Sequence, residues 1–424
     1  MSLFRRLTIL SSAVLFTGMA YGADVDDEDI QALRDWVNSK RMITVKELGG
    51  QLSISGEVHA EMQATNNTKN GKPVHGNGTR HEYDIEFNLA LDYRTENTWS
   101  AARIRFDNDA GIRNEHFGSG SFDKIRVDRA YFGYRLIDGD RHSMDIEVGR
   151  RAMFNIFDSK IQFASNFDGV NFKDTYAIDK VGDVYYQVGA FIVNEKHDQA
   201  AYVGEVGILN VANTGFYTKY SLIDWDTKHV NYGKKVEEFK KIPEVFHFIN
   251  SQLILGYKFI PQPWDKVVNI YLGGLYNHRA RGHKITNHKR ANFGGYTGFS
   301  VGQIKQRGDW NFEAIYQVVA AQAIPSFDVL GIGTGANGHN GLYYFELTEQ
   351  EKKKLNVKDK VVPATKASQA ESNTNFRGYK LTLQYMLTNN LNLFQEWSQS
   401  ITLDDHIGPF KRFKQYELEL IYAF

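Results

Sequence analysis

The chain has 424 residues, and its 50 Lys and Arg balance 50 Asp and Glu, so the formal net charge is zero. This balance argues against a nucleic-acid-binding protein, because such domains usually carry a basic excess. The absence of cysteine excludes disulfides, thiolate metal ligands and a cysteine nucleophile. An aromatic content of 13%, with 37 Gly and only 7 Pro, favours one large all-β unit over a disordered chain.

Residues 1–22 have the pattern of a secretory signal peptide. Arg5 and Arg6 form a positive start, and an apolar segment follows over residues 7–20. Ala20-Tyr21-Gly22 then supplies the small residues of a cleavage site. The apolar segment is shorter than the roughly 20 residues that a membrane-spanning helix needs. The sequence therefore predicts export, either to a soluble compartment or to a bacterial outer membrane.

Residues 23–51 are predicted to form a periplasmic lead-in that contains one short amphipathic helix, over residues 26–41. Acidic residues begin this segment at Asp26, and Lys40 and Arg41 end it, as the helix dipole favours. Its apolar side chains share one helical face: Ile30, Leu33, Trp36 and Val37. Packing on a partner, entry into a pore and a plain connecting role all stay open for this helix.

From residue 52 to residue 424 the hydrophobic pattern has a period of two, as in Ile85, Phe87 and Leu89, which alternate with polar neighbours. Many alternating segments have about ten residues, which is longer than a usual strand. That length matches the roughly 9–11 residues with which a tilted strand crosses a membrane. Sixteen such strands are predicted, over residues 52–63, 83–95, 99–107, 125–136, 142–151, 169–177, 183–193, 201–210, 215–225, 249–260, 267–278, 293–304, 310–321, 376–387, 391–402 and 414–424.

The gaps between these segments alternate in length. One set is short, as in 96–98 and 388–390, and the other set is mostly long, with 322–375 the longest and 194–200 the exception. The pattern predicts a transmembrane antiparallel β-barrel with short periplasmic turns and long extracellular loops. Aromatic residues collect near the short turns, as girdles at a membrane interface do. They are Tyr93, Trp99, Tyr134, Tyr176, Tyr185, Tyr186, Phe216, Tyr257, Phe259, Trp264, Trp310, Tyr385, Tyr422 and Phe424.

These features together resemble the Gram-negative outer-membrane porins of the sixteen-stranded general type. The chain ends Tyr422-Ala423-Phe424, similar to the terminal signal that the barrel assembly machinery reads. The stretch from Ile146 to Arg151 is similar to the segment before the third loop of porins, with Arg151 in place of a Gln. Residues 30–56 also resemble the lead-in of porins from amoeba-associated chlamydiae.

The resemblance implies a homotrimer in the outer membrane, in contact with lipid and lipopolysaccharide. It implies a water-filled channel for passive diffusion of small hydrophilic solutes and ions, narrowed by a third loop over Ala152 to Asp168. The loop is shorter than is usual for such a constriction, so the degree of narrowing stays open. The basic loop 279–292 suits anionic lipopolysaccharide or an anion funnel, and equally a plain solvated surface.

Strand parity assigns the charged residues to the lumen, because a Lys or Arg that faces lipid near the midplane costs roughly 2–4 kcal/mol. The resemblance implies a row of arginines facing acids on the third loop, and a hypothesis follows that Arg103 and Arg105 raise anion permeability. Ordinary solvated lumen charges are an equal alternative. The pore-lining or constriction candidates are Arg103, Arg105, Arg129, Arg135, Arg151, Asp158, Asp168, Asp84 and Glu86.

Two other classes of function stay open beside a general porin. A substrate-specific channel is a variant of it, and a closed structural or adhesin barrel shares the same strand pattern. An outer-membrane barrel enzyme is disfavoured, because no Ser or Asp is marked with a His partner at a rim. No catalytic group, metal or cofactor is expected, and the glycine-rich stretch from Gly333 to Gly338 lacks the strand and helix of a nucleotide site.

Overall fold

The computed structural model describes residues 50–74, 79–109, 124–195, 199–226, 247–262, 264–332, 344–346, 361–364 and 366–424. The predicted signal peptide (1–22) and the predicted helix (26–41) lie outside the described residues. Among the described residues, no helix is long and apolar enough to cross a membrane.

The long strands are antiparallel and match the sixteen predicted segments, which confirms that prediction. They are β1 (Gln51–Lys69), β3 (Thr79–Arg94), β4 (Thr98–Asp109), β5 (Lys124–Asp138), β6 (His142–Ala152), β7 (Asn166–Ile178), β8 (Gly182–Asn194), β9 (Gln199–Val211), β10 (Phe216–Asp226), β11 (Phe248–Phe259), β12 (Val268–Asn277), β13 (Phe293–Gly302), β14 (Trp310–Val319), β17 (Phe376–Met386), β18 (Leu391–Thr402) and β19 (Lys411–Ala423). The short strand β2 (Lys72–Pro73) extends the sheet, and β15 (Tyr344–Glu346) pairs with β16 (Val361–Pro363) outside it.

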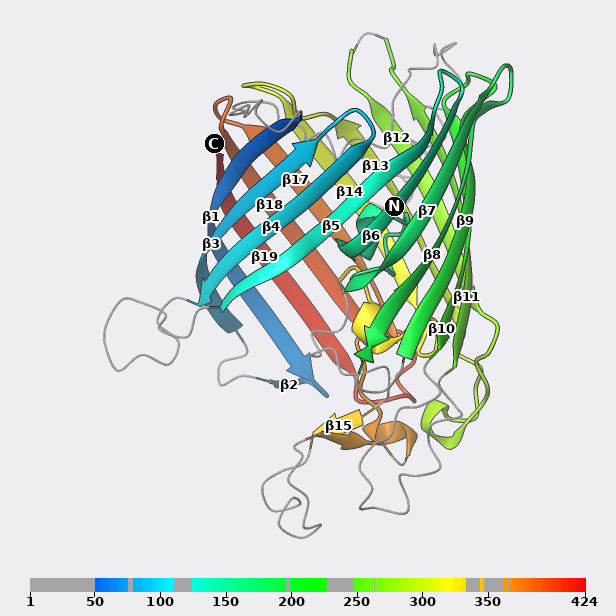
Figure 1. Ribbon diagram of the computed structural model, residues 1–424. Helices are drawn as coiled ribbons and strands as arrows, with labels where there is room; N and C mark the ends of the chain where they lie inside the picture. Colours follow the sequence, from blue (N-terminus) through cyan, green and yellow to red (C-terminus); the bar gives the residue numbers. More distant parts are fainter. Residues whose placement is uncertain are drawn as a thin grey trace.

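The strands form a closed barrel in which neighbours in the chain are neighbours in the sheet (Figure 1). Closure is made by β1 and β19, which pair from Glu57 opposite Ala423 to Lys69 opposite Lys411. Phe424 extends this seam, since its backbone N–H and C=O both bond to Gly56 at 2.9 Å. The fold is thus the predicted transmembrane barrel, and closure removes the exposed edges that an open sheet would have.

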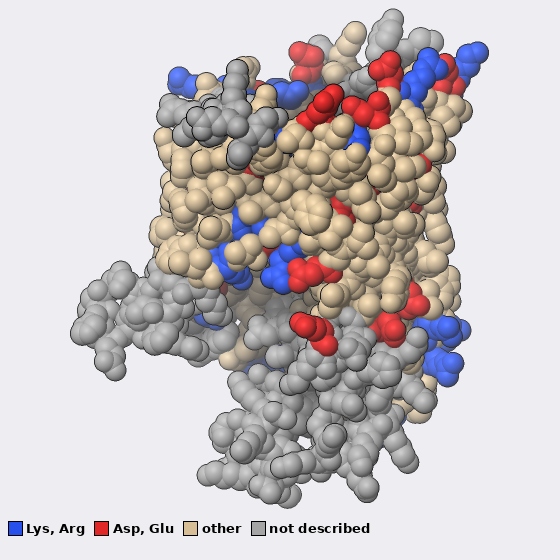
Figure 2. All heavy atoms as spheres, viewed as in Figure 1, with Lys and Arg blue, Asp and Glu red and all other residues tan. Residues whose placement is uncertain are grey.

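Side chains alternate between an outer face of exposed apolar residues and an inner face that points into the barrel. On β12, Ile270, Leu272 and Tyr276 are exposed on the outer face, whereas Tyr271 and Leu275 are buried on the inner face. Figure 2 shows an outer surface of mainly uncharged residues, with charged residues gathered mostly toward the two ends. This is the surface that a membrane-spanning barrel needs.

A β-bulge in β5 changes which residues face inward. Arg103 is opposite Arg129, but the next residue, Ile104, is opposite Val127, so Asp128 is an extra residue in β5. Because of this insertion, Ile125 and Val127 are exposed outside on one side of the bulge, and Phe132 and Tyr134 on the other. Without it, one half of β5 would present its apolar residues to the lumen.

The inside of the barrel is partly filled by loops. The third loop (residues 153–165) begins with η3 (Met153–Asn155), and the seventh loop (residues 320–375) contains η8 (Ser326–Asp328) and η9 (Ala367–Gln369). Phe157 and Phe163 of the third loop pack with inward residues of β7 to β11 in one buried apolar cluster, which includes Phe191 and Trp225. A second cluster joins the two loops to β11–β14 and β17. The hydrophobic core therefore lies within the barrel, against one side of its wall.

Candidate functional site

The third loop is held against the wall formed by β8 to β14. Inward-facing amides make most of these bonds. Gln187 donates to the Ile156 carbonyl at 2.6 Å, Gln252 to the Asp158 carbonyl at 2.8 Å, and Gln317 to the Lys160 carbonyl at 2.7 Å. Lys160 itself pairs with Glu313 of β14 at 3.0 Å. The loop thus lies inside the barrel and narrows it from one side.

A buried carboxylate of the seventh loop fixes the far end of the third loop. Asp328, which is fully buried, accepts the backbone N–H of Phe163 at 2.8 Å and that of Ser165 at 3.1 Å. Next to this contact, Gln162 forms a β-bridge with Val329. Burial raises the pKa of Asp328 to about 7, although the hydrogen bonds from Phe163 and Ser165 act in the opposite direction. The position of the constriction loop therefore depends on a group that titrates near neutral pH.

The predicted arginines lie on β4, β5 and β6, away from the wall that holds the third loop, and most are paired with acids. Arg103 binds Asp128, with its Nε 2.9 Å from the carboxylate, and Arg105 pairs with Glu86 of β3. Arg135 binds Asp145 at 2.9 Å, and Arg151 pairs with Glu147. Arg129 lies directly opposite Arg103. The positive charge of this wall is therefore largely compensated locally.

The neighbouring wall carries a row of carboxylates that cross several strands. Glu61 of β1 is directly opposite Glu419 of β19 on one side and Asp84 of β3 on the other. Glu417 of β19 is opposite Glu396 of β18. Ligand atoms of Glu61, Glu417 and Glu419 lie within 4.8 Å of one another. We call these five residues the carboxylate row.

His59 stands beside this row. Its Nδ1 lies 3.2 Å from Glu419, and its Nε2 lies 3.1 Å from Glu57. Lys380 of β17 pairs with Glu396 at 3.1 Å at the other end. The inner face of β1, β3 and β17–β19 is therefore lined by ionisable groups of both signs, with an excess of carboxylates at its centre.

The two predicted loop acids do not face the arginines. Asp158 is in the third loop, but it pairs with Lys219 of β10 at 3.2 Å, on the wall that the loop covers. Asp168 was expected in the loop and instead belongs to β7, where it pairs with Arg150 at 2.7 Å on the outer face. The prediction that Asp168 lines the constriction was wrong, because β7 begins two residues earlier, at Asn166.

A cavity of about 520 Å³ lies between the third loop and the inner faces of β7–β14 and β17. Its lining includes ammonium groups from Lys173, Lys219 and Lys258, and carboxylates such as Glu205. Its members on β10 and β11, such as Tyr217 and Lys258, lie toward the short-turn ends of those strands. This volume is within the range of small-molecule sites.

Four tyrosines of the cavity lie opposite glycines. Tyr185 is opposite Gly207, Tyr217 opposite Gly256, Tyr271 opposite Gly298 and Tyr296 opposite Gly273. In each case a Cβ added to the glycine would overlap the tyrosine ring. The rings therefore lie along the wall, where a side chain on the neighbouring strand would otherwise stand. The glycines leave space for the rings, and the tyrosines thereby present aromatic surface to the cavity.

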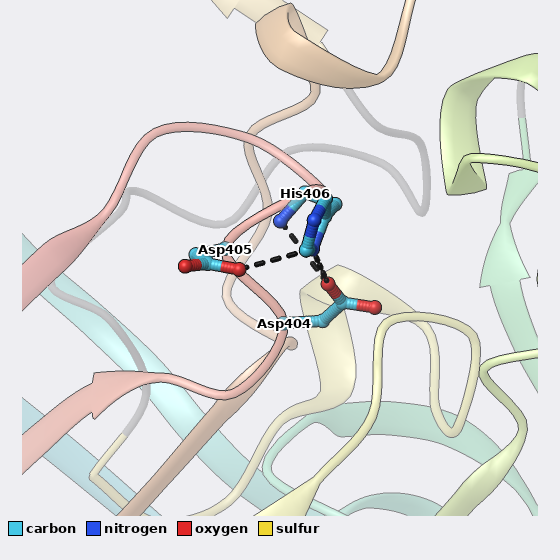
Figure 3. A group of neighbouring side chains, drawn as sticks. All are labelled: Asp404, Asp405 and His406. Atoms are coloured by element: carbon cyan, nitrogen blue, oxygen red, sulfur yellow. Dashed lines mark hydrogen bonds and ion pairs between the residues drawn. The ribbon is translucent and has the colours of Figure 1, made fainter.

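Long loops meet at the other end of the barrel. Lys289, from the loop between β12 and β13, pairs at 2.7 Å with Asp404, from the loop between β18 and β19. Asp404 also accepts from His406, as Figure 3 shows, and the trio Asp404, Asp405 and His406 could hold a cation. Burial alone would raise the pKa of Asp404, but the bonds from Lys289 and His406 hold it below its ordinary value. Asp404 therefore serves as a link between two loops.

Several lumen residues were not among the predicted site residues. They include Glu396, Glu417, Glu419, Lys219 and Lys258, all of which occupy the inward parity of their strands. The alternating pattern that located Asp84 and Glu86 would have located these as well.

Two predicted girdle aromatics, Trp99 and Tyr185, point inward: Trp99 donates to Glu147 at 2.9 Å, and Tyr185 donates to Glu205 at 2.8 Å.

Comparison with solved structures supports the fold. The chain is similar to OprB of Pseudomonas putida, with a TM-score of 0.52 and 10% identity over 88% of this chain and 94% of that chain. A Rhodopseudomonas blastica porin, as a triple mutant, also matches, with a TM-score of 0.43 and 10% identity over 88% of this chain and 100% of that chain. No family model and no curated protein matches the chain. The likeness establishes a porin-type barrel fold.

Proposed function

We propose that the protein is an outer-membrane porin that lets small hydrophilic solutes and ions diffuse through its barrel. The observation that carries the proposal is the division of the lumen. The third loop packs on β8–β14 through Gln187, Gln252 and Gln317, while the inner face of β1, β3–β6 and β17–β19 carries charged side chains. Charged, partly exposed side chains inside a barrel with an apolar exterior suit a hydrated path.

The two groups of charges suggest how the pore treats ions. Arg103 and Arg105 would favour anions locally, whereas Glu61, Glu417 and Glu419 would favour cations. Each of these arginines is paired with an acid, whereas the carboxylate row is compact. The row is therefore proposed to have the larger influence on the ion selectivity of the pore.

The remaining parts of the proposal concern assembly. Export by the segment 1–22, recognition of Phe424 by the barrel assembly machinery, a homotrimeric state and contact with lipopolysaccharide all go with a porin role. The position of Phe424 at the closing seam, bonded to Gly56, supports a role for this residue in closure.

The test is single-channel conductance of the refolded protein in a planar bilayer, first in symmetric salt and then in a salt gradient. Stepwise conductance would support the proposal, and steps in groups of three would support the trimer. A protein that shifts on heating as a folded barrel does, yet stays silent in the bilayer, would refute it and favour a closed structural barrel.

A further inference from the structure

The cavity beneath the third loop combines features that a binding site needs. It has about 520 Å³ of space, aromatic surface from tyrosines that lie over glycines, and ionisable groups held at low exposure. The chemistry of its lining indicates which kind of molecule would fit it.

Positive charge is concentrated around one ring. The ammonium groups of Lys219 and Lys258 lie 5.7 Å and 5.9 Å from the centre of the Tyr217 ring. Both side chains are nearly buried, at 2% and 8% exposure. Asp158 contacts Lys219 at 3.2 Å and supplies one negative charge. An anion beside these two ammonium groups would be stabilised, because the place is poorly solvated.

A third lysine lines the same cavity, as does an acid with an unsatisfied acceptor atom. The ammonium of Lys173 is 5.3 Å from the centre of the Tyr185 ring, and Tyr185 donates its hydroxyl to Glu205. Gln187 donates to the same oxygen, Oε1, of Glu205 at 3.0 Å. The second oxygen, Oε2, is buried and has no hydrogen-bond partner among the described residues. A buried carboxylate oxygen of this kind is costly unless a donor reaches it.

We infer that this cavity binds a small organic anion that also carries hydroxyl groups, such as a sugar phosphate or a hydroxy acid. The anionic group lies between Lys219 and Lys258, a hydroxyl donates to Oε2 of Glu205, and the carbon frame rests on Tyr217 and Tyr185. This inference rests on the proposed porin function for its biological meaning, since it names the solute class that the pore would favour. The binding itself is independent of conduction.

The experiment is isothermal titration calorimetry of the folded protein in detergent at low salt. Three probes are compared: glucose 6-phosphate, glucose and inorganic phosphate. Glucose 6-phosphate is expected to bind more tightly than either of the others, because it alone satisfies both the lysines and Glu205. Lys258→Gln is expected to weaken its binding about tenfold or more, as loss of a charge-assisted hydrogen bond does. Lys266→Gln, which changes a lysine at the turn between β11 and β12 that pairs with Asp309, should leave binding unchanged.

Glu205→Gln should bring the affinity for glucose 6-phosphate close to that for inorganic phosphate. Equal affinity for glucose and glucose 6-phosphate, or full binding by Lys258→Gln, would overturn the inference. Binding of inorganic phosphate as tight as that of glucose 6-phosphate would also overturn it, since the contact between a hydroxyl and Glu205 would then add nothing to the affinity. If Lys258→Gln does not fold, Lys219→Gln takes its place with the same expectation, since Lys219 is the other lysine that flanks the anionic group. Binding that persists in a protein without conductance would refute the porin function and leave the site standing.

Discussion

Glu61 of β1 lies directly opposite Glu419 of β19, at the seam where the barrel closes. On the other side of Glu61 stands Asp84 of β3. Like charges directly opposite each other weaken a sheet, and here they occur in succession across three strands. Such an arrangement costs stability, so its presence on the lumen wall fits a role in attracting cations to the path.

Replacement of Glu417 by Gln tests this cost and this role together. Glu417 is opposite Glu396 and close to Glu61 and Glu419, so Glu417→Gln should stabilise the barrel by about 0.2–1 kcal/mol. The same change should shift the reversal potential in a salt gradient toward anion preference. Urea unfolding in lipid vesicles and bilayer recordings measure the two effects. Glu96→Gln, in the exposed turn before β4, is the control and should change neither the stability nor the reversal potential. If the Glu417→Gln pore kept the ion selectivity of the wild type, the proposed role of Glu417 in attracting cations would be ruled out.

Arg105→Ala should move the reversal potential in the opposite direction, toward cations. Removal of the guanidinium takes away the ion pair between Arg105 and Glu86, which leaves Glu86 next to the carboxylate row. Arg141→Ala is a suitable control, because Arg141 pairs with Asp179 at 2.8 Å and both are exposed at a turn. Identical reversal potentials for wild type and Arg105→Ala would end the proposed influence of this arginine.

The third loop should loosen as the pH rises through neutrality. The pKa of Asp328 is raised from 3.8 to about 7, chiefly by burial. The folded carboxyl thus keeps its proton where the unfolded one has lost it. Its contribution to stability is full below about pH 4 and is lost as the pH rises through about 7.

Hydrogen exchange of residues 153–165, corrected for the intrinsic effect of pH, measures this dependence. Protection should fall between about pH 5 and about pH 8 in the wild type. In Asp328→Asn it should be nearly constant over that range, whereas Asp405→Asn, at an exposed site, should behave as wild type. Equal pH dependence in wild type and Asp328→Asn would show that another group is responsible.

Two adjacent glycines of β12 should respond differently to alanine. A Cβ on Gly273 would overlap the Tyr296 ring, whereas a Cβ on Gly274 would meet nothing within 4 Å. Gly273→Ala should therefore destabilise the barrel by about 1–3 kcal/mol, as overpacking does, while Gly274→Ala should be close to neutral. Urea midpoints of the two variants give the comparison. Similar midpoints would mean that the tyrosine has room to move.

The alternating pattern was sufficient to predict the strands, since each strand has one face toward lipid and one toward the lumen. It was also sufficient to place Arg103 and Arg105 on one face. Where the expectation of an aromatic girdle conflicted with parity, parity was right: Trp99 shares a face with Arg103, and Tyr185 and Tyr186 are adjacent, so only one of them can face lipid.

Features that depend on contacts between distant residues could not be predicted in this way. The inserted residue Asp128 changes the parity of β5 and is recognisable only from its pairing with β4. The side of the barrel on which the third loop packs depends on amides such as Gln252 and Gln317, which resemble any other lumen residue in sequence. Local periodicity was therefore enough to predict the fold, whereas the site depends on contacts between residues that are distant in the chain.

The contact between Phe163 and Asp328 joins residues that are 165 positions apart in the chain. During synthesis and insertion, eight strands, β7 to β14, come between them. The hydrogen bond that fixes the far end of the third loop can therefore form only after all of these strands have been made. A barrel in which this bond has not yet formed would have a wider pore than the folded barrel. The last step of folding would then be the narrowing of the pore by the third loop.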